Sequence, residues 1–138
     1  MQHAVNAEKW PEGMHAAVLP LRSVGVKADL RSYELPLCIQ GPRPDAALVA
    51  LKLKTIRGIN RIVWNMGPDF SSVSVRRASC TPDRVRILQR ADALVTAHLR
   101  RFGLMEAVWQ FPVVLLPLSF DSRPDGEAVV LRPVASTR

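Results

Sequence analysis

The sequence has 138 residues and is 48% hydrophobic, which suffices for a single domain with a core of useful size. Nineteen lysines and arginines against twelve acidic residues give a net charge of +7, which favours nucleotides, nucleic acids or acidic protein surfaces as partners. The apolar run near Val113 to Leu116 is too short to cross a bilayer, and residues 1–13 lack the apolar core of a leader. A soluble protein without a membrane segment is therefore expected.

Cysteine and histidine spacing argues against a disulfide scaffold and against a metal site. Cys38 and Cys80 lie far apart and form no Cys-x-x-Cys pair, which favours a reduced, cytoplasmic protein. The three histidines show no metal-ligand spacing with a cysteine or a carboxylate. We therefore predict a cytoplasmic protein that binds no metal.

The first part of the chain predicts two strands. Branched apolar residues from Ala17 to Val26 predict one strand, and strict alternation from Tyr33 to Ile39 predicts a second. The short polar connection at residues 27–29 favours an antiparallel hairpin. Pro36 indicates that its strand lies at a sheet edge or carries a bulge.

A helix and a third strand are expected next, after the break at Gly41 to Pro44. Asp45 can cap the helix and Gly58 can end it. The predicted apolar positions of this helix are Leu48, Val49, Leu51, Leu53 and Ile56, and the positions predicted to face solvent are Lys52, Lys54 and Arg57. A strand from Ile59 to Met66 then completes a strand-strand-helix-strand unit.

The second half begins with a predicted loop, from Gly67 to Cys80, that has room for a short strand. Thr81 is expected to cap a helix that has Pro82 and Asp83 in its first turn and that ends near Gly103. Its predicted inward stripe consists of Leu88, Ala91, Val95 and Leu99. Two more strands, Gln110 to Phe120 and Ala128 to Val134, are joined by the turn-rich residues 121–126.

This order of elements predicts the α+β class. We expect an antiparallel β-sheet with helices packed on one face, made of one complete and one truncated ββαβ-like repeat. An incomplete repeat leaves a sheet edge or an apolar face that a partner can cover.

Several motifs, in this order, resemble the C-terminal domain of glutamine-hydrolysing GMP synthase. They are LPLRSVGVKADLRSY at 19–33, GINRIVWNMG at 58–67, LQRADALVTAHL at 88–99, WQFPVVLLPLSFD at 109–121 and EAVVLRPVAST at 127–137. The resemblance runs from about His15 to Ser136. It implies an N-terminal extension over residues 1–14 and a dimerisation domain over residues 15–138 that contributes to a site for xanthosine monophosphate (XMP).

The resemblance implies three XMP-binding residues: Asp29, Arg31 and Gln110. A guanidinium such as that of Arg31 suits phosphate oxygens, and an uncharged amide such as that of Gln110 suits a base or a ribose. Two other interpretations stay open, because Asp29 and Arg31 can form a local salt bridge at the turn and Gln110 can cap a strand end.

No catalytic residue is expected in this chain. The resemblance implies that ATP and magnesium bind in a pyrophosphatase domain, and no glycine-rich phosphate loop of that kind occurs among the seven glycines. The family's Lys-Pro-Pro to Glu-Trp-Glu tail, which contacts the nucleotide, has no counterpart here. We therefore expect no cofactor, weak or absent affinity for XMP alone, and assembly as a homodimer or with a separate GMP synthase subunit.

A cluster of arginines supports an alternative, a stand-alone nucleotide- or RNA-binding module that reuses the fold. The cluster consists of Arg76, Arg77, Arg84, Arg86, Arg90, Arg100 and Arg101. Two features disfavour nucleic acid: the Gly-x-x-Gly clamp of KH domains is missing, and aromatic residues for base stacking are sparse.

Overall fold

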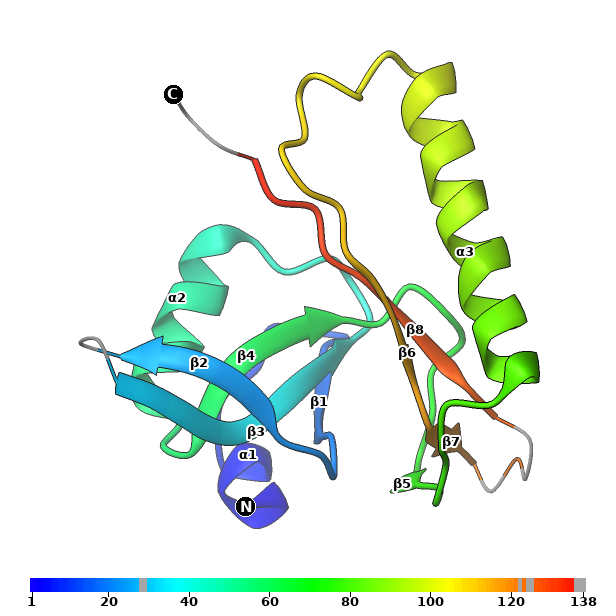
Figure 1. Cartoon of the computed structure of the whole chain (residues 1–138). Coiled ribbons are helices and arrows are strands. Elements are labelled where there is room, and N and C mark those ends of the chain that lie inside the picture. The colour runs from blue at the N-terminus through cyan, green and yellow to red at the C-terminus, as the bar shows by residue number, and fades with distance from the viewer. Residues whose placement is uncertain (28–29, 122, 124–125, 136–138) are drawn as a thin grey trace. The chain divides into compact units, whose positions relative to one another are not determined.

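A computed structural model describes residues 1–27, 30–121, 123 and 126–135 of the chain (Figure 1). Its residues divide into two compact units, Met1–Ser74 and Val75–Arg138. None of the helices in the described part of the chain is long and apolar enough to span a membrane.

The first unit is built around one central strand, β3. Its elements are α1 (Gln2–Asn6), β1 (His15–Val18), β2 (Ser23–Lys27), β3 (Leu30–Gln40), α2 (Ala46–Thr55) and β4 (Ile59–Trp64). Both β1 and β2 pair antiparallel with β3, at its second and first half respectively. The strand β4 pairs in parallel with the second half of β3, because α2 returns the chain to the middle of β3, where Ile59 pairs with Leu35. The predicted α+β class and the predicted β2–β3 hairpin are confirmed.

The core of this unit lies between the sheet and the two helices. Val5 of α1 and Ile56 at the end of α2 are buried against Leu37 and Ile59 of the sheet. The predicted bulge is also confirmed, because the β3–β4 register shifts between Leu35 and Pro36. Asp45 caps α2 as predicted, with a side-chain oxygen that accepts a hydrogen bond of 2.7 Å from the Leu48 amide.

The predicted orientation of α2 is wrong at two positions. Leu51 is 53% exposed, whereas Lys52 is 4% exposed. The Lys52 ammonium donates hydrogen bonds of 2.8 Å to a carboxylate oxygen of Glu8 and to the carbonyl oxygen of Lys9. It also lies 4.8 Å from the centre of the Trp10 ring. The segment that follows α1 therefore supplies partners that make burial of this lysine favourable.

The predicted strand from Ala17 to Val26 is interrupted. β1 ends at Val18 and β2 begins at Ser23, and between them the Leu21 amide donates a hydrogen bond of 2.8 Å to the Leu19 carbonyl. Pro20 has no N–H to contribute to a ladder, so the chain turns at this point. In the second unit the strand predicted from Gln110 to Phe120 is likewise interrupted at Pro117.

The second unit contains one long helix and an antiparallel strand pair. Its elements are α3 (Pro82–Arg101), β6 (Val113–Leu116), β7 (Leu118–Phe120) and β8 (Ala128–Leu131), and the short predicted strand of the loop is β5 (Val73–Val75) at the junction of the units. β6 and β8 pair antiparallel and lie side by side in Figure 1. β8 is the last helix or strand within the residues that are described.

The ends of α3 are those predicted. The Thr81 hydroxyl oxygen accepts a hydrogen bond of 3.4 Å from the Arg84 amide, and Pro82 occupies the first turn. The helix ends at Arg101, before Gly103. The inward stripe is confirmed, because each of its four residues is half-buried, whereas no residue of α3 is fully buried.

Candidate functional site

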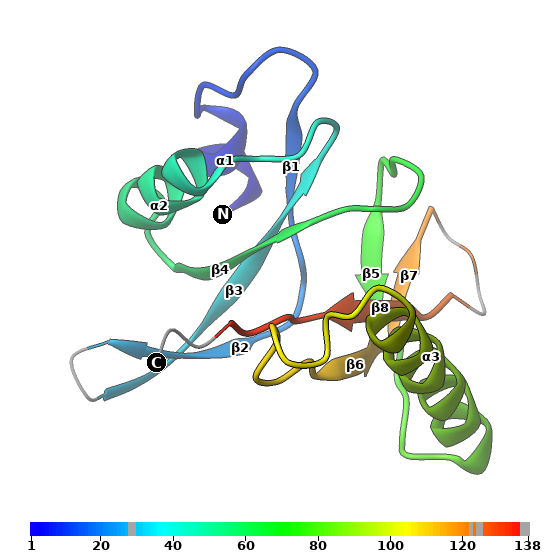
Figure 2. The same cartoon turned by 90° about the horizontal axis from the view of Figure 1, so that it is seen from above.

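The β2–β3 hairpin carries an exposed face that mixes apolar, aromatic and cationic side chains. Val24 pairs with Tyr33 and Val26 pairs with Arg31, so these four side chains share one face of the hairpin. Val26 is 73% exposed and Tyr33 is 54% exposed. Figure 2 shows the hairpin reaching beyond α1 and α2. We call Val24, Val26, Arg31 and Tyr33 the hairpin face.

Arg31 presents an exposed guanidinium on the hairpin face. Its side chain is exposed, and no hydrogen bond or ion pair joins it to another described residue. Asp29, the second predicted XMP residue, lies outside the described residues. Because the side chain of Arg31 is exposed, an anionic ligand can reach its guanidinium.

Two other arginines donate hydrogen bonds to the backbone of the hairpin. The Arg22 guanidinium donates a hydrogen bond of 2.9 Å to the Tyr33 carbonyl, and the Arg61 guanidinium donates one of 3.1 Å to the Val24 carbonyl. Because these contacts involve the backbone of Val24 and Tyr33, they hold the strands without occupying the exposed side chains.

The opposite face of the hairpin packs closely against β4. The Asn60 amide group donates a hydrogen bond of 2.8 Å to the Ser23 carbonyl, and the Ser23 hydroxyl donates one to the Asn60 side-chain oxygen. A Cβ atom at Gly25 would lie 2.9 Å from the Ser32 hydroxyl oxygen and 3.0 Å from the Asn60 amide nitrogen. Glycine is therefore required here for close approach, and the packing fixes the orientation of the hairpin face.

A pocket of about 500 Å³ in the first unit has a different chemistry. It is lined by Gln2, Asn6, Ala16, Ala17, Val18, Gln40, Phe70, Ser71, Ser72 and Val73. None of these lining residues is cationic, and the Gln2 amide already bonds the Ala16 carbonyl at 3.0 Å and the Val18 amide at 2.8 Å. This pocket therefore suits a phosphate less well than the hairpin face.

Gln110, the third predicted XMP residue, belongs to the second unit. It forms an antiparallel bridge with Val134, whose amide donates a hydrogen bond of 2.8 Å to the Gln110 carbonyl. The side chain of Gln110 is exposed. Arg31 and Gln110 thus lie in different units, and each presents an exposed polar side chain.

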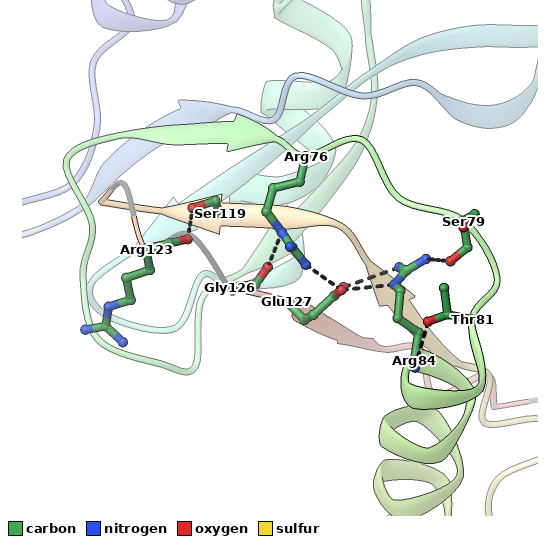
Figure 3. Close-up of polar contacts among 8 residues, drawn as sticks. All are labelled: Arg76, Ser79, Thr81, Arg84, Ser119, Arg123, Gly126 and Glu127. Atoms are coloured by element: carbon green, nitrogen blue, oxygen red, sulfur yellow. Dashed lines mark hydrogen bonds and ion pairs between the residues drawn. The ribbon is translucent and has the colours of Figure 1, made fainter.

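The second unit also contains an ion-pair cluster that sequence analysis did not find (Figure 3). One carboxylate oxygen of Glu127 lies 2.7 Å from an Arg76 nitrogen and 2.9 Å from an Arg84 nitrogen. Arg76 also donates a hydrogen bond of 3.0 Å to the Gly126 carbonyl. Since Arg86 pairs with Asp83, three arginines of the basic cluster are paired, which reduces the charge available to a nucleic acid.

Comparison with known proteins finds GMP synthases that are similar to most of this chain. A probable glutamine-hydrolyzing GMP synthase of Leptospira interrogans is 32% identical over 139 residues, which cover 91% of this chain and 22% of that protein. A probable glutamine-hydrolyzing GMP synthase of Caenorhabditis elegans is 32% identical over 156 residues, which cover 95% of this chain and 21% of that protein. This chain is homologous to a segment of glutamine-hydrolysing GMP synthases.

The homology extends to shorter and more similar matches. The GMP synthase of Thermobifida fusca is 47% identical over 62 residues, which cover 41% of this chain and 12% of that protein. No protein-family model matches the chain. The chain spans about a fifth of the length of the GMP synthases from Leptospira and C. elegans, and the similarity supports a domain related to GMP biosynthesis.

The two cysteines of this chain lie in different environments. Cys38 is buried in β3, and desolvation by burial raises the pKa of its thiol to about 11. Cys80 is exposed. Because a thiolate is the reactive species, burial leaves Cys38 unsuited to nucleophilic catalysis near neutral pH. Among the described residues there is no group of three or more His, Cys, Asp or Glu side chains that could hold a metal.

These environments predict unequal reactivity of the two thiols. At pH 8 the folded chain should react with one equivalent of Ellman's reagent, at Cys80, and the unfolded chain with two. A Cys80→Ser variant should give no rapid reaction until denaturant is added. Rapid reaction of two thiols in the folded wild-type chain would contradict the burial of Cys38.

Proposed function

We propose that this chain is a GMP synthase C-terminal-like domain that acts in dimerisation or assembly and contributes to the XMP site. The observation that carries the XMP part is the exposed guanidinium of Arg31, which shares the hairpin face with Tyr33. A guanidinium binds phosphate oxygens in a bidentate manner, and an exposed aromatic ring offers a surface for a base.

In this proposal Asp29, Arg31 and Gln110 all contribute to recognition of XMP. Arg31 contacts the phosphate, because it is the cation of the three. Gln110 offers an exposed amide that can donate to and accept from a purine or a ribose. Asp29 accepts a hydrogen bond from a ligand donor such as a ribose hydroxyl. None of these three residues changes a covalent bond of the ligand.

We assign turnover to other domains of the synthase. ATP and magnesium would bind in a pyrophosphatase domain and glutamine would be hydrolysed in a glutaminase domain. The environment of Cys38 supports this division of roles, because its thiol is buried and its pKa is raised. The chain itself would function in the cytoplasm as a binding and assembly module.

A titration with XMP tests the role of Arg31. We expect weak binding by the chain alone, observed as chemical-shift changes at backbone amides of β2 and β3 when XMP is added at millimolar concentration. Arg31→Ala should raise the dissociation constant at least about tenfold, because a charge-assisted contact to phosphate is lost. Arg31→Lys should recover part of the affinity, since it keeps the charge but not the planar fork.

Arg43 provides a matched control for this titration. It is exposed, belongs to the same unit and precedes α2, so Arg43→Ala removes an equal charge away from the hairpin face. The dissociation constant of Arg43→Ala should stay within about twofold of wild type, since removing a distant exposed charge has little effect. Equal loss of affinity in both variants would indicate general attraction to the net charge rather than a site at Arg31.

The assembly part of the proposal rests on exposed apolar side chains of the second unit. Trp109 is 67% exposed, and Leu94, Phe102 and Met105 are also exposed. Such groups are typical of surfaces that a partner covers. A chain that stays monomeric in light scattering at high concentration, and whose melting temperature responds neither to a GMP synthase nor to XMP, would contradict the proposal.

A further inference from the structure

One face of α3 carries a row of exposed residues that follow one another at alternating spacings of four and three residues. They are Asp83, Ile87, Arg90, Leu94, Ala97 and Arg101. This interval pattern is that of the a and d positions of a coiled coil, whose average period is 3.5 residues. The row, which we call the seam, is separate from the inward stripe of α3. The helix therefore has a second face suited to packing against another helix.

The seam is open to a partner. Leu94 is 62% exposed and Ile87 is 42% exposed. Asp83, at the beginning of the seam, has a side chain that is 82% exposed. Among the described residues Asp83 pairs with Arg86, which lies beside the seam rather than in it.

The order of residues in the seam is complementary to itself when the direction is reversed. In an antiparallel pair of α3 helices, Asp83 of each chain meets Arg101 of the other, so both ends place opposite charges together. Ile87 meets Ala97, which joins a large and a small side chain in one layer. Arg90 meets Leu94, and its aliphatic stem can cover the leucine while the guanidinium reaches water.

A parallel pair lacks this complementarity. It would place Asp83 against Asp83, Arg90 against Arg90 and Arg101 against Arg101, and like charges in contact oppose association. We propose that α3 pairs antiparallel with α3 of a second copy of this chain through the seam. The proposal rests on the assembly role proposed above and names the surface that performs it.

The two kinds of contact have different roles in this pairing. Exposed ion pairs contribute little to stability on average, so the Asp83 and Arg101 pairs select the orientation. Burial of Leu94 and Ile87 supplies most of the affinity. At each end of the helix pair, Asp83 keeps its ion pair with Arg86 of the same chain and also meets Arg101 of the other chain. The aspartate therefore lies between two cations.

A charge exchange tests the pairing in the whole chain. Sedimentation over a concentration series gives the dimer dissociation constant for each variant, and circular dichroism checks that α3 is retained. Arg101→Asp places two carboxylates together at both ends and should raise the constant at least about tenfold. Asp83→Arg should act in the same direction. The double variant Asp83→Arg/Arg101→Asp should return the constant to within about threefold of wild type.

Asp92 supplies the matched control, because Asp92→Arg makes the same change of charge as Asp83→Arg on the side of α3 opposite the seam. Its dissociation constant should stay within about threefold of wild type. A wild-type dimer that is indifferent to Arg101→Asp, or a double variant as weak as the singles, would overturn the seam and leave the assembly role standing. A wild-type chain that remains monomeric throughout would overturn both.

Discussion

Replacing Glu127 by alanine should lower the free energy of unfolding of the second unit by about 2 to 3 kcal/mol. The Glu127 side chain is 12% exposed and bonds two guanidinium groups, those of Arg76 and Arg84. Removing the carboxylate leaves two partly buried cations without their partner, which costs more than the loss of one exposed ion pair. Because both arginines keep some access to water, we expect an effect at or below the lower end of the range of about 3 to 5 kcal/mol that is found for fully buried pairs.

Urea denaturation followed by circular dichroism measures this effect. Glu106→Ala is the control, because Glu106 is an exposed carboxylate of the same unit, and it should change the free energy by less than about 0.5 kcal/mol. Glu127→Gln should have an intermediate effect, since the amide oxygen can still accept one hydrogen bond. Equal stability of Glu127→Ala and Glu106→Ala would show that the cluster in Figure 3 does not stabilise the fold.

Replacing Lys52 by alanine should destabilise the first unit by about 2 to 3 kcal/mol. The change removes a buried aliphatic stem, an ion pair with Glu8 and a hydrogen bond to the Lys9 carbonyl. It also removes the cation from the face of Trp10. We expect the segment after α1 to lose protection against amide hydrogen exchange, because these contacts hold it to α2.

Lys54, two residues from Lys52 on the same helix, is the control for this prediction. Lys54 is exposed on the same helix, so Lys54→Ala should change the free energy of unfolding by less than about 0.5 kcal/mol. Lys52→Met keeps the stem but removes the charge, and its effect should lie between those of the two alanine variants. Similar effects of Lys52→Ala and Lys54→Ala would contradict the burial of Lys52.

Much of the fold was predictable because its signals act over a few residues. The alternation of apolar and polar residues predicted β3, and the short polar connection before it predicted the hairpin. Asp45 and Thr81, whose side-chain oxygens cap helices, predicted where α2 and α3 begin. Strand lengths were less predictable. Apolar composition continues through Pro20 and Pro117, but the strands are interrupted at both prolines, so one predicted strand became β1 and β2 and another became β6 and β7. Pro36, in contrast, lies within β3, where a bulge accommodates it.

The candidate site was predictable only in part. A motif beside the hairpin pointed to Arg31, and the structure adds that its guanidinium is exposed and lies on the same face as Tyr33. The assignments of Asp29, Arg31 and Gln110 to XMP remain predictions. The residues of the seam on α3 follow a heptad spacing in the sequence. Only the exposure of Ile87 and Leu94 in the structure distinguishes the seam from the inward stripe.

By itself the sequence determined the α+β class, the hairpin, the helix caps and the homology to GMP synthase, because each depends on neighbouring residues or on their order. Only the tertiary structure decided which charges are buried. Lys52 and Glu8, like Arg76 and Glu127, are far apart along the chain, and periodicity within one helix carries no information about a distant partner. A charged side chain enters the interior only when such a partner offsets its loss of water, so the fold determines its position.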